Sequence, residues 1–484
     1  GRIDYTINKN FVVGGTIMNL NERPFTQKVN IGEEPISNTI WGFDLSYNKE
    51  LPWLTRLIDR IPGISTKAPS RINVFGEFAH LIPGYNKVIG KPGYSQIDDF
   101  EGAESVINYQ IFSQWRLGTV PHKQTERFPF AEKFNDIRSG YGRALMTWYN
   151  MDPVFFRQNQ GATPEPIFSD KNSRSNHYVR EVRQVEVFPN LQLPPGQQPN
   201  LNVFDVAFFP KVRGPYNMDF NSLNPDGTIA DPRKSFGSIM RRTETTDWDG
   251  ANIDYIEFWL MNPFDKDLDQ LKEWETGTQG AVNENRLPGG GGELLIQIGN
   301  MTEDLLQDGK FFFENGMPTP TNNLTANETV WGRVPGEQVI NQAFSNGTDE
   351  RRFQDIGYDG LISSASSDAF VKSEQEHFAA LLANLPAGLT QAAIDEILAD
   401  PSADNFRPFI GDMYVNDGST PVAGSYIHER YKKFQLPEGN SPEGDINQAN
   451  SQFPNSEDIN NDNTLNQSEN YFQYKINLKP GSFE

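Results

Sequence analysis

The sequence predicts an all-β protein with one small helical segment. Aromatic residues are abundant, with 34 Phe, 16 Tyr and 8 Trp, and so are turn formers, with 33 Pro and 41 Gly. This composition suits β-strands joined by turns and long loops. Apolar and polar side chains alternate near both ends of the chain, whereas helical spacing is convincing only within residues 363–400.

Charge and cysteine content narrow the classes of function. Asp and Glu total 64 against 42 Lys and Arg, which gives a net charge of -22. Nucleic acid is therefore a poor candidate partner, because phosphate backbones are bound by basic patches. The chain has no cysteine, so disulfides and thiolate sites are excluded and any metal should be held by oxygen. It begins at Gly1 rather than Met, and we expect a mature product or a piece of a longer protein.

The first 90 residues show the pattern of lipid-facing strands. No run of 18 apolar residues occurs, which excludes a transmembrane helix but not a transmembrane strand, whose signal is about ten alternating residues. Between Trp41 and Tyr47 apolar side chains alternate with small or polar ones, and Asn10–Asn21 and Arg71–Leu81 are similar. An ordinary antiparallel sheet with one wet face shows the same alternation, so that alternative stays open. Leu51–Ile64 predicts a short amphipathic connector.

Changes in composition predict five segments. At 484 residues the chain is long enough for two to four domains. The segments are strands of barrel type at 1–90, a first β-module with long loops at 91–235, a second β-sandwich module at 236–362, a helical hairpin at 363–400, and an acidic loop region with a calcium-binding turn and a terminal strand at 401–484.

The organising stretch of the sequence is Asp247–Phe264. From Ile253 onward its apolar residues are nearly continuous and rich in aromatic and β-branched side chains. This predicts a central strand, Ile253–Leu260, covered on both faces, with Trp259 buried. Further strands are expected at Ser105–Phe112, Tyr178–Phe188, Leu201–Phe209, Glu293–Ile298 and Phe472–Leu478, and helices at Ser363–Leu385 and Thr390–Ala399.

The sharpest local motif is an acidic loop near the end of the chain. It places oxygen-bearing residues at the ligand positions of the EF-hand calcium loop, with a backbone carbonyl at one of them. Where that pattern has Gly, this chain has Asn463, which tolerates a left-handed backbone. A solvated Asn- and Asp-rich loop is the alternative. The predicted structural Ca²⁺ ligands are Asp458, Asn460, Asp462, Thr464, Asn466 and Glu469.

Other candidate sites are weaker. A cluster of Asp98, Asp99, Glu101 and Glu104 predicts either a second calcium site or an acidic turn. The five histidines show no metal-ligand spacing, and no nucleophile-elbow motif occurs. Catalytic residues are therefore not expected, and no other cofactor is predicted.

Several long segments resemble a known family. They are Asn10–Ser37, Ile97–Ala103, Gly214–Met218, Phe236–Arg241, Asn252–Phe264 and Asp355–Leu361. In this order they resemble the SprA/Sov family, the outer-membrane translocon of the type 9 secretion system of Bacteroidota. The family's proteins are several times longer than this chain, so the resemblance implies an internal fragment.

This resemblance carries its own expectations of fold and function. It implies that residues 1–90 belong to one very large transmembrane β-barrel and that the remainder forms β-sandwich (jelly-roll-like) modules inserted with it. The implied activity is passive conduction of folded cargo proteins with C-terminal secretion signals, in an outer-membrane system for secretion and gliding motility. Implied partners are outer-membrane lipid and secretion proteins that occupy a lateral opening or plug the pore. The alternative is a cell-surface glycan-binding protein whose Trp248, Trp259 and Trp331 stack on sugars.

Overall fold

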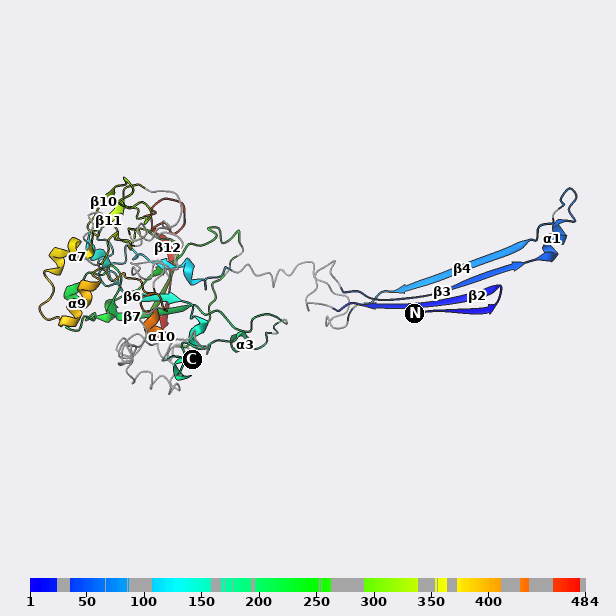
Figure 1. Ribbon diagram of the computed structural model, residues 1–484, viewed down its shortest axis with the longest axis horizontal. Coiled ribbons are helices and arrows are strands. Elements are labelled where there is room, and N and C mark those ends of the chain that lie inside the picture. Colours follow the sequence, from blue (N-terminus) through cyan, green and yellow to red (C-terminus); the bar gives the residue numbers. More distant parts are fainter. Residues whose placement is uncertain are drawn as a thin grey trace. The chain divides into compact units, whose positions relative to one another are not determined.

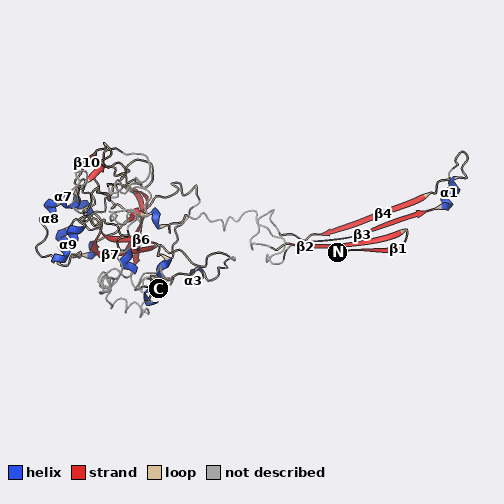
Figure 2. Ribbon diagram, viewed as in Figure 1, coloured by secondary structure: helices blue, strands red, loops and turns tan. Residues whose placement is uncertain are grey.

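The structure is a computed structural model of the chain. It describes residues 1–23, 35–65, 67–84, 86, 107–157, 167–169, 171–175, 177–191, 193, 196–251, 253, 255–262, 291–337, 353–354, 356–363, 372–410, 427–434 and 456–478. The chain divides into two units, Gly1–Val106 and Ile107–Glu484. In the described ranges strands are the main regular structure and helices are few and short (Figure 1, Figure 2), in agreement with an all-β class.

The first unit is built on a four-stranded antiparallel sheet. Its strands β1 (Arg2–Asn8), β2 (Phe11–Asn21), β3 (Ser37–Glu50) and β4 (Arg71–Ile82) lie in that order, and β2, β3 and β4 pair without a shift in register. The alternation of the sequence predicted β2 to β4, and β1 was missed. The expected connector is present as α1 (Pro52–Ile58), which begins on a proline.

The sheet of the first unit is open in the described ranges. β1 and β4 are its edge strands, because each pairs with one neighbour only. Apart from Pro35, buried apolar side chains are found only from Leu117 onward in the described part of the chain. The sheet is therefore one layer whose two faces are both accessible within its own unit.

The second unit holds its strands in pairs. β6 (Ala144–Tyr149) pairs with β7 (Asp205–Arg213), and β9 (Gly292–Asn300) pairs with β12 (Asn470–Leu478) along its full length. The shorter pairs are β5 (Arg116–Leu117) with β8 (Ile239–Met240) and β10 (Ala326–Glu328) with β11 (Arg333–Pro335). β12 was predicted from alternation, β9 contains the predicted strand Glu293–Ile298, and β7 overlaps the predicted strand Leu201–Phe209.

Short helices complete the second unit, and side-chain caps start several of them. The Thr390 hydroxyl accepts the Ala393 N–H at the start of α9, and Ser373 forms a capping box with Glu376 in α7. In the described ranges the helices are α2 (Lys171–Arg174), α3 (Gln184–Val187), α7 (Glu374–His377), α8 (Ala379–Leu382), α9 (Gln391–Ala399) and α10 (Ile427–Tyr431), with η2 (Phe112–Gln114), η3 (Ile137–Gly140), η4 (Pro153–Phe155), η5 (Phe220–Ser222) and η6 (Pro232–Lys234). Among the helices of these ranges, none is long and apolar enough to cross a membrane.

Three apolar clusters make the core of the second unit, and each joins segments far apart in the sequence. One is largely aromatic and contains Trp148, Tyr216, Phe312, Trp331 and Tyr358. The second includes Tyr149, Phe155, Phe406, Tyr431 and Phe434. The third places α9 against Met218, Phe220, Leu361 and Phe378. Residues of the predicted segments 91–235, 236–362 and 401–484 thus share cores.

Two expectations about strands are wrong. Ile253 and Tyr255–Leu260, the described part of the predicted central strand, have no strand structure, and Trp259 is 64% exposed. The apolar run predicted a buried strand because it would need cover on both faces, but the described residues do not cover Tyr255–Leu260. Tyr178–Phe188 is also not a strand, since it contains turns and α3. Residues 105–106 lie outside the described residues, and 107–112 have no strand structure.

The finer expectations of fold have different outcomes. Four open strands do not by themselves form a closed barrel, and the two-stranded sheets of the described ranges do not show a jelly-roll sandwich. Helices were expected across Ser363–Leu385, and α7 and α8 occupy part of that stretch, whereas residues 364–371 lie outside the described residues. The unit boundary follows Val106 rather than residue 90.

Candidate functional site

The register of the first sheet separates its side chains by chemistry. Ile3, Gly15, Phe43 and Phe78 are successive cross-strand partners, so they share one face. We call this the apolar face, and its members also include Tyr5, Phe11, Val13, Ile17, Trp41, Leu45, Tyr47, Val74, His80 and Ile82. Large side chains on it are open to solvent, with Tyr5 69% and Phe43 49% exposed.

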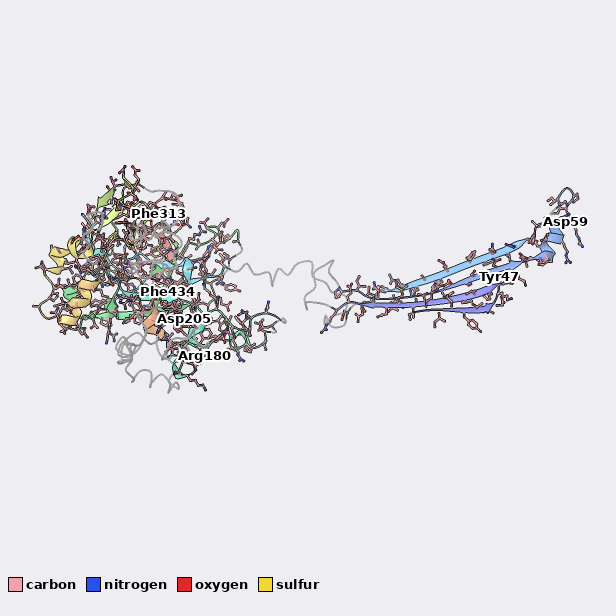
Figure 3. The ribbon with its side chains drawn as sticks, viewed as in Figure 1. Tyr47, Asp59, Arg180, Asp205, Phe313 and Phe434 are labelled. Atoms are coloured by element: carbon pink, nitrogen blue, oxygen red, sulfur yellow. The ribbon has the colours of Figure 1, made fainter. Side chains whose placement is uncertain are left out.

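Aromatic rings gather at two levels of the apolar face. Trp41 lies against Phe78 at 5.4 Å and against the His80 ring at 5.7 Å, and Phe43 stacks on Phe78 at 5.3 Å. At the other level Phe11 meets Tyr47 edge-on at 5.8 Å. Tyr47 lies towards the end of the sheet where α1 follows (Figure 3). Between the two levels the face carries the smaller side chains of Val13 and Leu45, and Gly76 adds no side chain there.

Charged residues of these strands lie on the opposite face, with the exception of Lys49 at the end of β3. We call this the ionic face. Arg2 forms ion pairs with Asp4 at 2.9 Å and Asp44 at 3.1 Å, and Arg71 pairs with Glu50 at 2.6 Å. A Cβ at Gly14 would lie 2.6 Å from Asp44 Oδ1, so the glycine makes room for this group. The apolar members of this face, such as Phe75, are interspersed with these charges.

The predicted calcium loop forms a closed, hydrogen-bonded turn. Both Asp458 carboxylate oxygens accept backbone N–H groups, from Asp462 at 3.0 Å and Asn463 at 2.8 Å. The Asp462 carboxylate accepts from Thr464 N–H at 2.8 Å and from the amides of Asn460 and Asn466. Asn463 has φ +61°, which is the left-handed backbone expected where the EF-hand pattern has Gly.

Glu303, a residue outside the motif, accepts hydrogen bonds from this loop. Glu303 follows β9, and its Oε1 accepts the N–H groups of Ile459 at 2.9 Å and Asn460 at 3.0 Å. Its Oε2 accepts both the N–H and the side-chain amide of Asn466. Desolvation raises the pKa of Glu303, while these hydrogen bonds lower it. The sequence analysis missed Glu303 because it precedes the loop by more than 150 residues in the chain.

The carboxylate of Glu469, the last predicted ligand, contacts His122. Its Oε2 accepts the His122 N–H at 2.9 Å, its Oε1 lies 4.0 Å from His122 Nδ1, and burial raises its pKa. In the described residues, Asp458, Asp462 and Glu469 do not form a group of three acids within 4.8 Å. Glu469 therefore pairs with a separate segment in this structure, and the calcium-ligand set stays a prediction. The second acidic cluster, Asp98 with Asp99, Glu101 and Glu104, lies outside the described residues.

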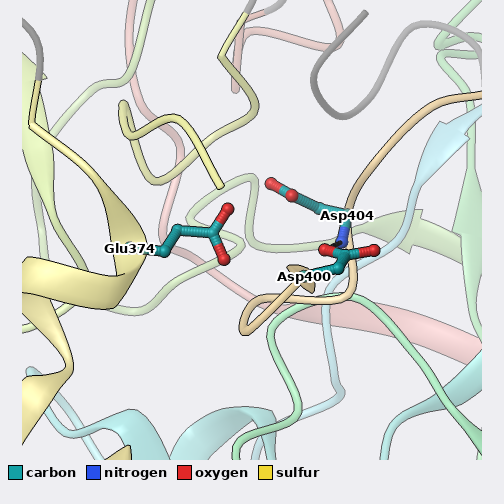
Figure 4. A group of neighbouring side chains, drawn as sticks. All are labelled: Glu374, Asp400 and Asp404. Atoms are coloured by element: carbon teal, nitrogen blue, oxygen red, sulfur yellow. Dashed lines mark hydrogen bonds between the residues drawn. The ribbon is translucent and has the colours of Figure 1, made fainter. Parts of the chain in front are cut away.

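A group of acids that the sequence analysis did not predict lies in the core. Carboxylate oxygens of Glu374, Asp400 and Asp404 lie within 4.8 Å of one another, and all three residues are buried. Figure 4 shows Glu374 reaching the group from α7 and the two aspartates from the loop after α9. Desolvation, followed by the charges of Asp359, Glu374 and Asp400, raises the pKa of Asp404 well above its usual value, and Tyr216 offsets only part of this.

The tryptophans of the glycan-binding alternative do not form a common platform. Trp331 is 1% exposed and belongs to the aromatic core. Trp248 is partly buried and donates its indole N–H to the Thr245 carbonyl at 3.2 Å. Trp259 alone of the three is largely exposed, and it meets Phe188 edge-on at 5.6 Å. The alternative therefore lacks the stacking surface that it requires.

Comparison with known proteins identifies one family. No curated protein matches the chain. Residues 380–484 match the family model SprA_N, described as a motility related/secretion protein. The matched range includes α9, Asp400, Asp404, the acidic loop and β12. The match lies C-terminal to all six segments that carry the resemblance to the SprA/Sov family, and it supports a SprA-type fragment from other residues of the chain.

Proposed function

We propose that this chain is part of the outer-membrane translocon of a type 9 secretion system, which conducts folded cargo proteins to the cell surface. The observation that carries the proposal is the two-faced sheet of residues 2–82. The SprA_N match in the second unit supports it independently, because it comes from other residues of the same chain.

The dimensions of the apolar face suit a bilayer. Trp41 and Tyr47 are six residues apart on β3, which corresponds to about 20 Å at about 3.3 Å per residue. A lipid-facing band on an outer-membrane barrel is about 25 Å tall and is bordered by aromatic girdles. The two aromatic levels of the apolar face are placed as such girdles would be. An ion-paired opposite face is suited to a water-filled lumen.

In this proposal the sheet is one sector of a larger barrel. An unpaired backbone group in lipid costs several kcal/mol, so β1 and β4 would each pair with further strands that lie outside residues 2–82. The second unit, with its long loops, would narrow or cap the lumen. Secretion partners would contact the lateral opening or plug the pore, and cargo would be recognised through its C-terminal secretion signal. Conduction is passive, and we assign no catalytic residues.

Calcium is proposed as a structural ion at the acidic loop. Asp458, Asn460 and Asp462 supply side-chain oxygens, Thr464 a carbonyl, and Asn466 lies beside them. Ion binding would replace the hydrogen bonds that now hold the Asp458 and Asp462 carboxylates. Glu469 would join only after leaving His122. Such an ion would fix the start of β12 against β9.

Site-specific fluorescence tests the proposed lipid contact. The chain has no cysteine, so Phe43→Cys on the apolar face and Ser46→Cys on the ionic face each create one labelling site on the same strand. The labelled protein is studied in liposomes with an environment-sensitive fluorophore. We expect quenching by spin-labelled lipid at residue 43 and by aqueous iodide at residue 46.

The paired design separates a lipid-facing sheet from a sheet that one protein partner covers. Iodide quenching at residue 43 equal to that at residue 46 would mean that the apolar face is in water, and the proposal would fail. Protection of residue 43 from both quenchers would mean a protein contact in place of lipid, which also contradicts it.

A further inference from the structure

Four acids are concentrated in the core of the second unit, around the loop that follows α9. Asp359, Glu374, Asp400 and Asp404 are all 5% exposed or less. Buried acids are rare unless they are paired or bind a metal. The two cationic side chains that contact this loop are Lys433, 2.8 Å from Asp400 Oδ2, and Arg213, which donates to the carbonyls of Asp400 and Pro401. Among the described residues, two cationic groups therefore accompany four buried acids.

Hydrogen bonds satisfy some of these carboxylate oxygens and leave others open. Ser402 donates its hydroxyl to Asp359 Oδ2 at 2.6 Å and its N–H to Glu374 Oε2 at 2.5 Å. Both oxygens of Asp404 and Oε1 of Glu374 are buried without a hydrogen bond of good geometry, although the Tyr216 hydroxyl lies beside Asp404 and the Ser363 hydroxyl beside Glu374. These open oxygens belong to the group in which all three acids lie within 4.8 Å (Figure 4).

Another buried acid shows how the same unit treats a structural carboxylate. Glu457 is 3% exposed, and its two oxygens accept the N–H groups of Leu305 at 2.9 Å and Phe312 at 3.0 Å. Asp404 is at least as buried, and among the hydrogen bonds of the described residues neither of its carboxylate oxygens accepts a backbone N–H. Leaving a buried charged group unsatisfied costs more than a hydrogen bond contributes. The carboxyl group of Asp404 is therefore not stabilised in the way that the Glu457 carboxylate is.

The backbone around Asp404 is shaped to the carboxylate. Gly357 has φ +68°, and a Cβ there would lie 2.1 Å from Asp404 Oδ2. Ala403 is also left-handed, with φ +58°, a conformation that costs a non-glycine residue energy. Asp400 caps the C-terminus of α9, where the helix dipole adds negative potential and favours a cation. A cation is therefore the ligand that suits this group.

We propose that Glu374, Asp400 and Asp404 bind one divalent cation in the core of the second unit, and that this cation is Ca²⁺. Two ligands on opposite sides of a calcium ion are separated by about 4.8 Å, since calcium–oxygen distances are about 2.3–2.6 Å, so one ion can reach all three acids. The ligand set is oxygen only, whereas zinc favours nitrogen and sulfur. Asp359 then helps to place Glu374 through Ser402.

Such an ion would connect elements that lie far apart in the sequence. It would connect α7 to the loop after α9, and through Gly357 and Tyr216 to the aromatic core. This position is separate from the acidic loop of residues 458–466. The proposal also does not depend on the translocon assignment.

Calcium binding is measured on the full chain in detergent, after chelator treatment and removal of the chelator. Asp404→Asn keeps the side-chain shape and removes the charge, and Glu374→Gln does the same from α7. We expect each variant to lose one equivalent of bound Ca²⁺ in equilibrium dialysis, or to bind that equivalent at least tenfold more weakly. Asp395→Asn, an exposed acid on α9, is the matched control and should retain full binding.

A second comparison separates Ca²⁺ binding at the buried site from Ca²⁺ binding at the acidic loop. Asp462→Asn removes a carboxylate of that loop, so Asp404→Asn is compared with its parent in both the native and the Asp462→Asn background. Loss of one equivalent in both backgrounds supports the buried site. If Asp404→Asn and Glu374→Gln bind as much Ca²⁺ as their parents, or if the thermal midpoint of the Asp462→Asn chain does not rise when Ca²⁺ is added, the proposal is overturned.

Discussion

The hydroxyl of Tyr216 accepts the backbone N–H of Tyr358 at 2.8 Å, across 142 residues of sequence. Both tyrosines are buried, and their rings meet edge-on at 6.4 Å. The bond joins two of the segments that carry the family resemblance, Gly214–Met218 and Asp355–Leu361. Tyr216 also donates its backbone N–H to the Ser402 carbonyl at 2.7 Å. One residue thus links both segments to the loop that holds Asp404.

Tyr216→Phe should destabilise the second unit. The substitution leaves the N–H of Tyr358 buried without its acceptor, which costs about 1–3 kcal/mol. Denaturant unfolding followed by tryptophan fluorescence measures the change. Tyr474→Phe, an exposed tyrosine on β12, should leave the unfolding free energy unchanged, and an equal loss in both variants would contradict the role given to Tyr216.

Gly357→Ala should be more harmful than an alanine at a glycine with the same type of backbone. Its φ of +68° disfavours a side chain, and the new methyl group would meet Asp404 Oδ2 at 2.1 Å. Gly196 has φ +95° with no atom within 4 Å of an added Cβ, so Gly196→Ala isolates the backbone effect, which is about 1 kcal/mol. Unfolding midpoints of the two variants give the comparison. Equal losses of stability in the two variants would show that the Asp404 side chain moves away from the new methyl group without an energetic cost.

Local pattern predicted the extended strands well, because a strand with one wet face leaves its mark on consecutive residues. β2, β3, β4 and β12 were found in this way. β1 was missed although Arg2 and Asp4 alternate with Ile3 and Tyr5, which is the same pattern. Ile253–Leu260 was misread for a different reason, since an apolar run does not show whether another segment covers it.

Long-range contacts were not predictable from one sequence. Asp400 and Asp404 look like ordinary polar residues of a turn, and nothing near them indicates that Glu374 lies within ligand distance. Glu303 likewise has no motif of its own, although it accepts four hydrogen bonds from the acidic loop. These groups are brought together by the packing of the aromatic cores, which depends on residues throughout the second unit.

The stability of the second unit should depend on the protonation of Asp205. Burial raises its pKa to about 7 from an ordinary 3.8, with a smaller opposing effect from the Met151 N–H. The folded state therefore holds this proton where the unfolded state has lost it, and the contribution of Asp205 falls as pH rises from about 4 to about 7. The contribution of Asp205 to the free energy of unfolding should fall by at most about 1.4 kcal/mol per pH unit.

Asp205→Asn removes this dependence. The unfolding free energy of the variant should rise relative to that of the native chain between pH 4 and pH 7, and denaturant unfolding across this range measures the difference. The pKa of Asp226 is lowered by its hydrogen bonds with Thr228, so Asp226→Asn is a control with the opposite sign and with its change at more acidic pH. A constant difference between Asp205→Asn and the native chain would show that Asp205 does not titrate differently on folding.

Glu303 gives the sharpest test of the acidic loop. Glu303→Gln replaces a charged acceptor of four hydrogen bonds by one that retains a single carbonyl oxygen, so Ile459, Asn460 and Asn466 lose part of their support. The loop should then be less ordered before it binds an ion, and its calcium affinity should fall by about tenfold for each 1.4 kcal/mol of added ordering cost. Calorimetry on the chelator-treated Asp404→Asn background measures the loop alone.

The same background ranks the predicted ligands. Asp458→Ala should abolish loop binding, because Asp458 oxygens close the turn onto Asp462 and Asn463. Glu469→Ala should have a smaller effect in this conformation, since Glu469 is held by His122 rather than directed at the loop. If Glu469→Ala abolishes binding as fully as Asp458→Ala does, the glutamate must leave His122 when the ion arrives, and calcium then rearranges the segment before β12. Undiminished binding in both variants would rule out a calcium site in this loop.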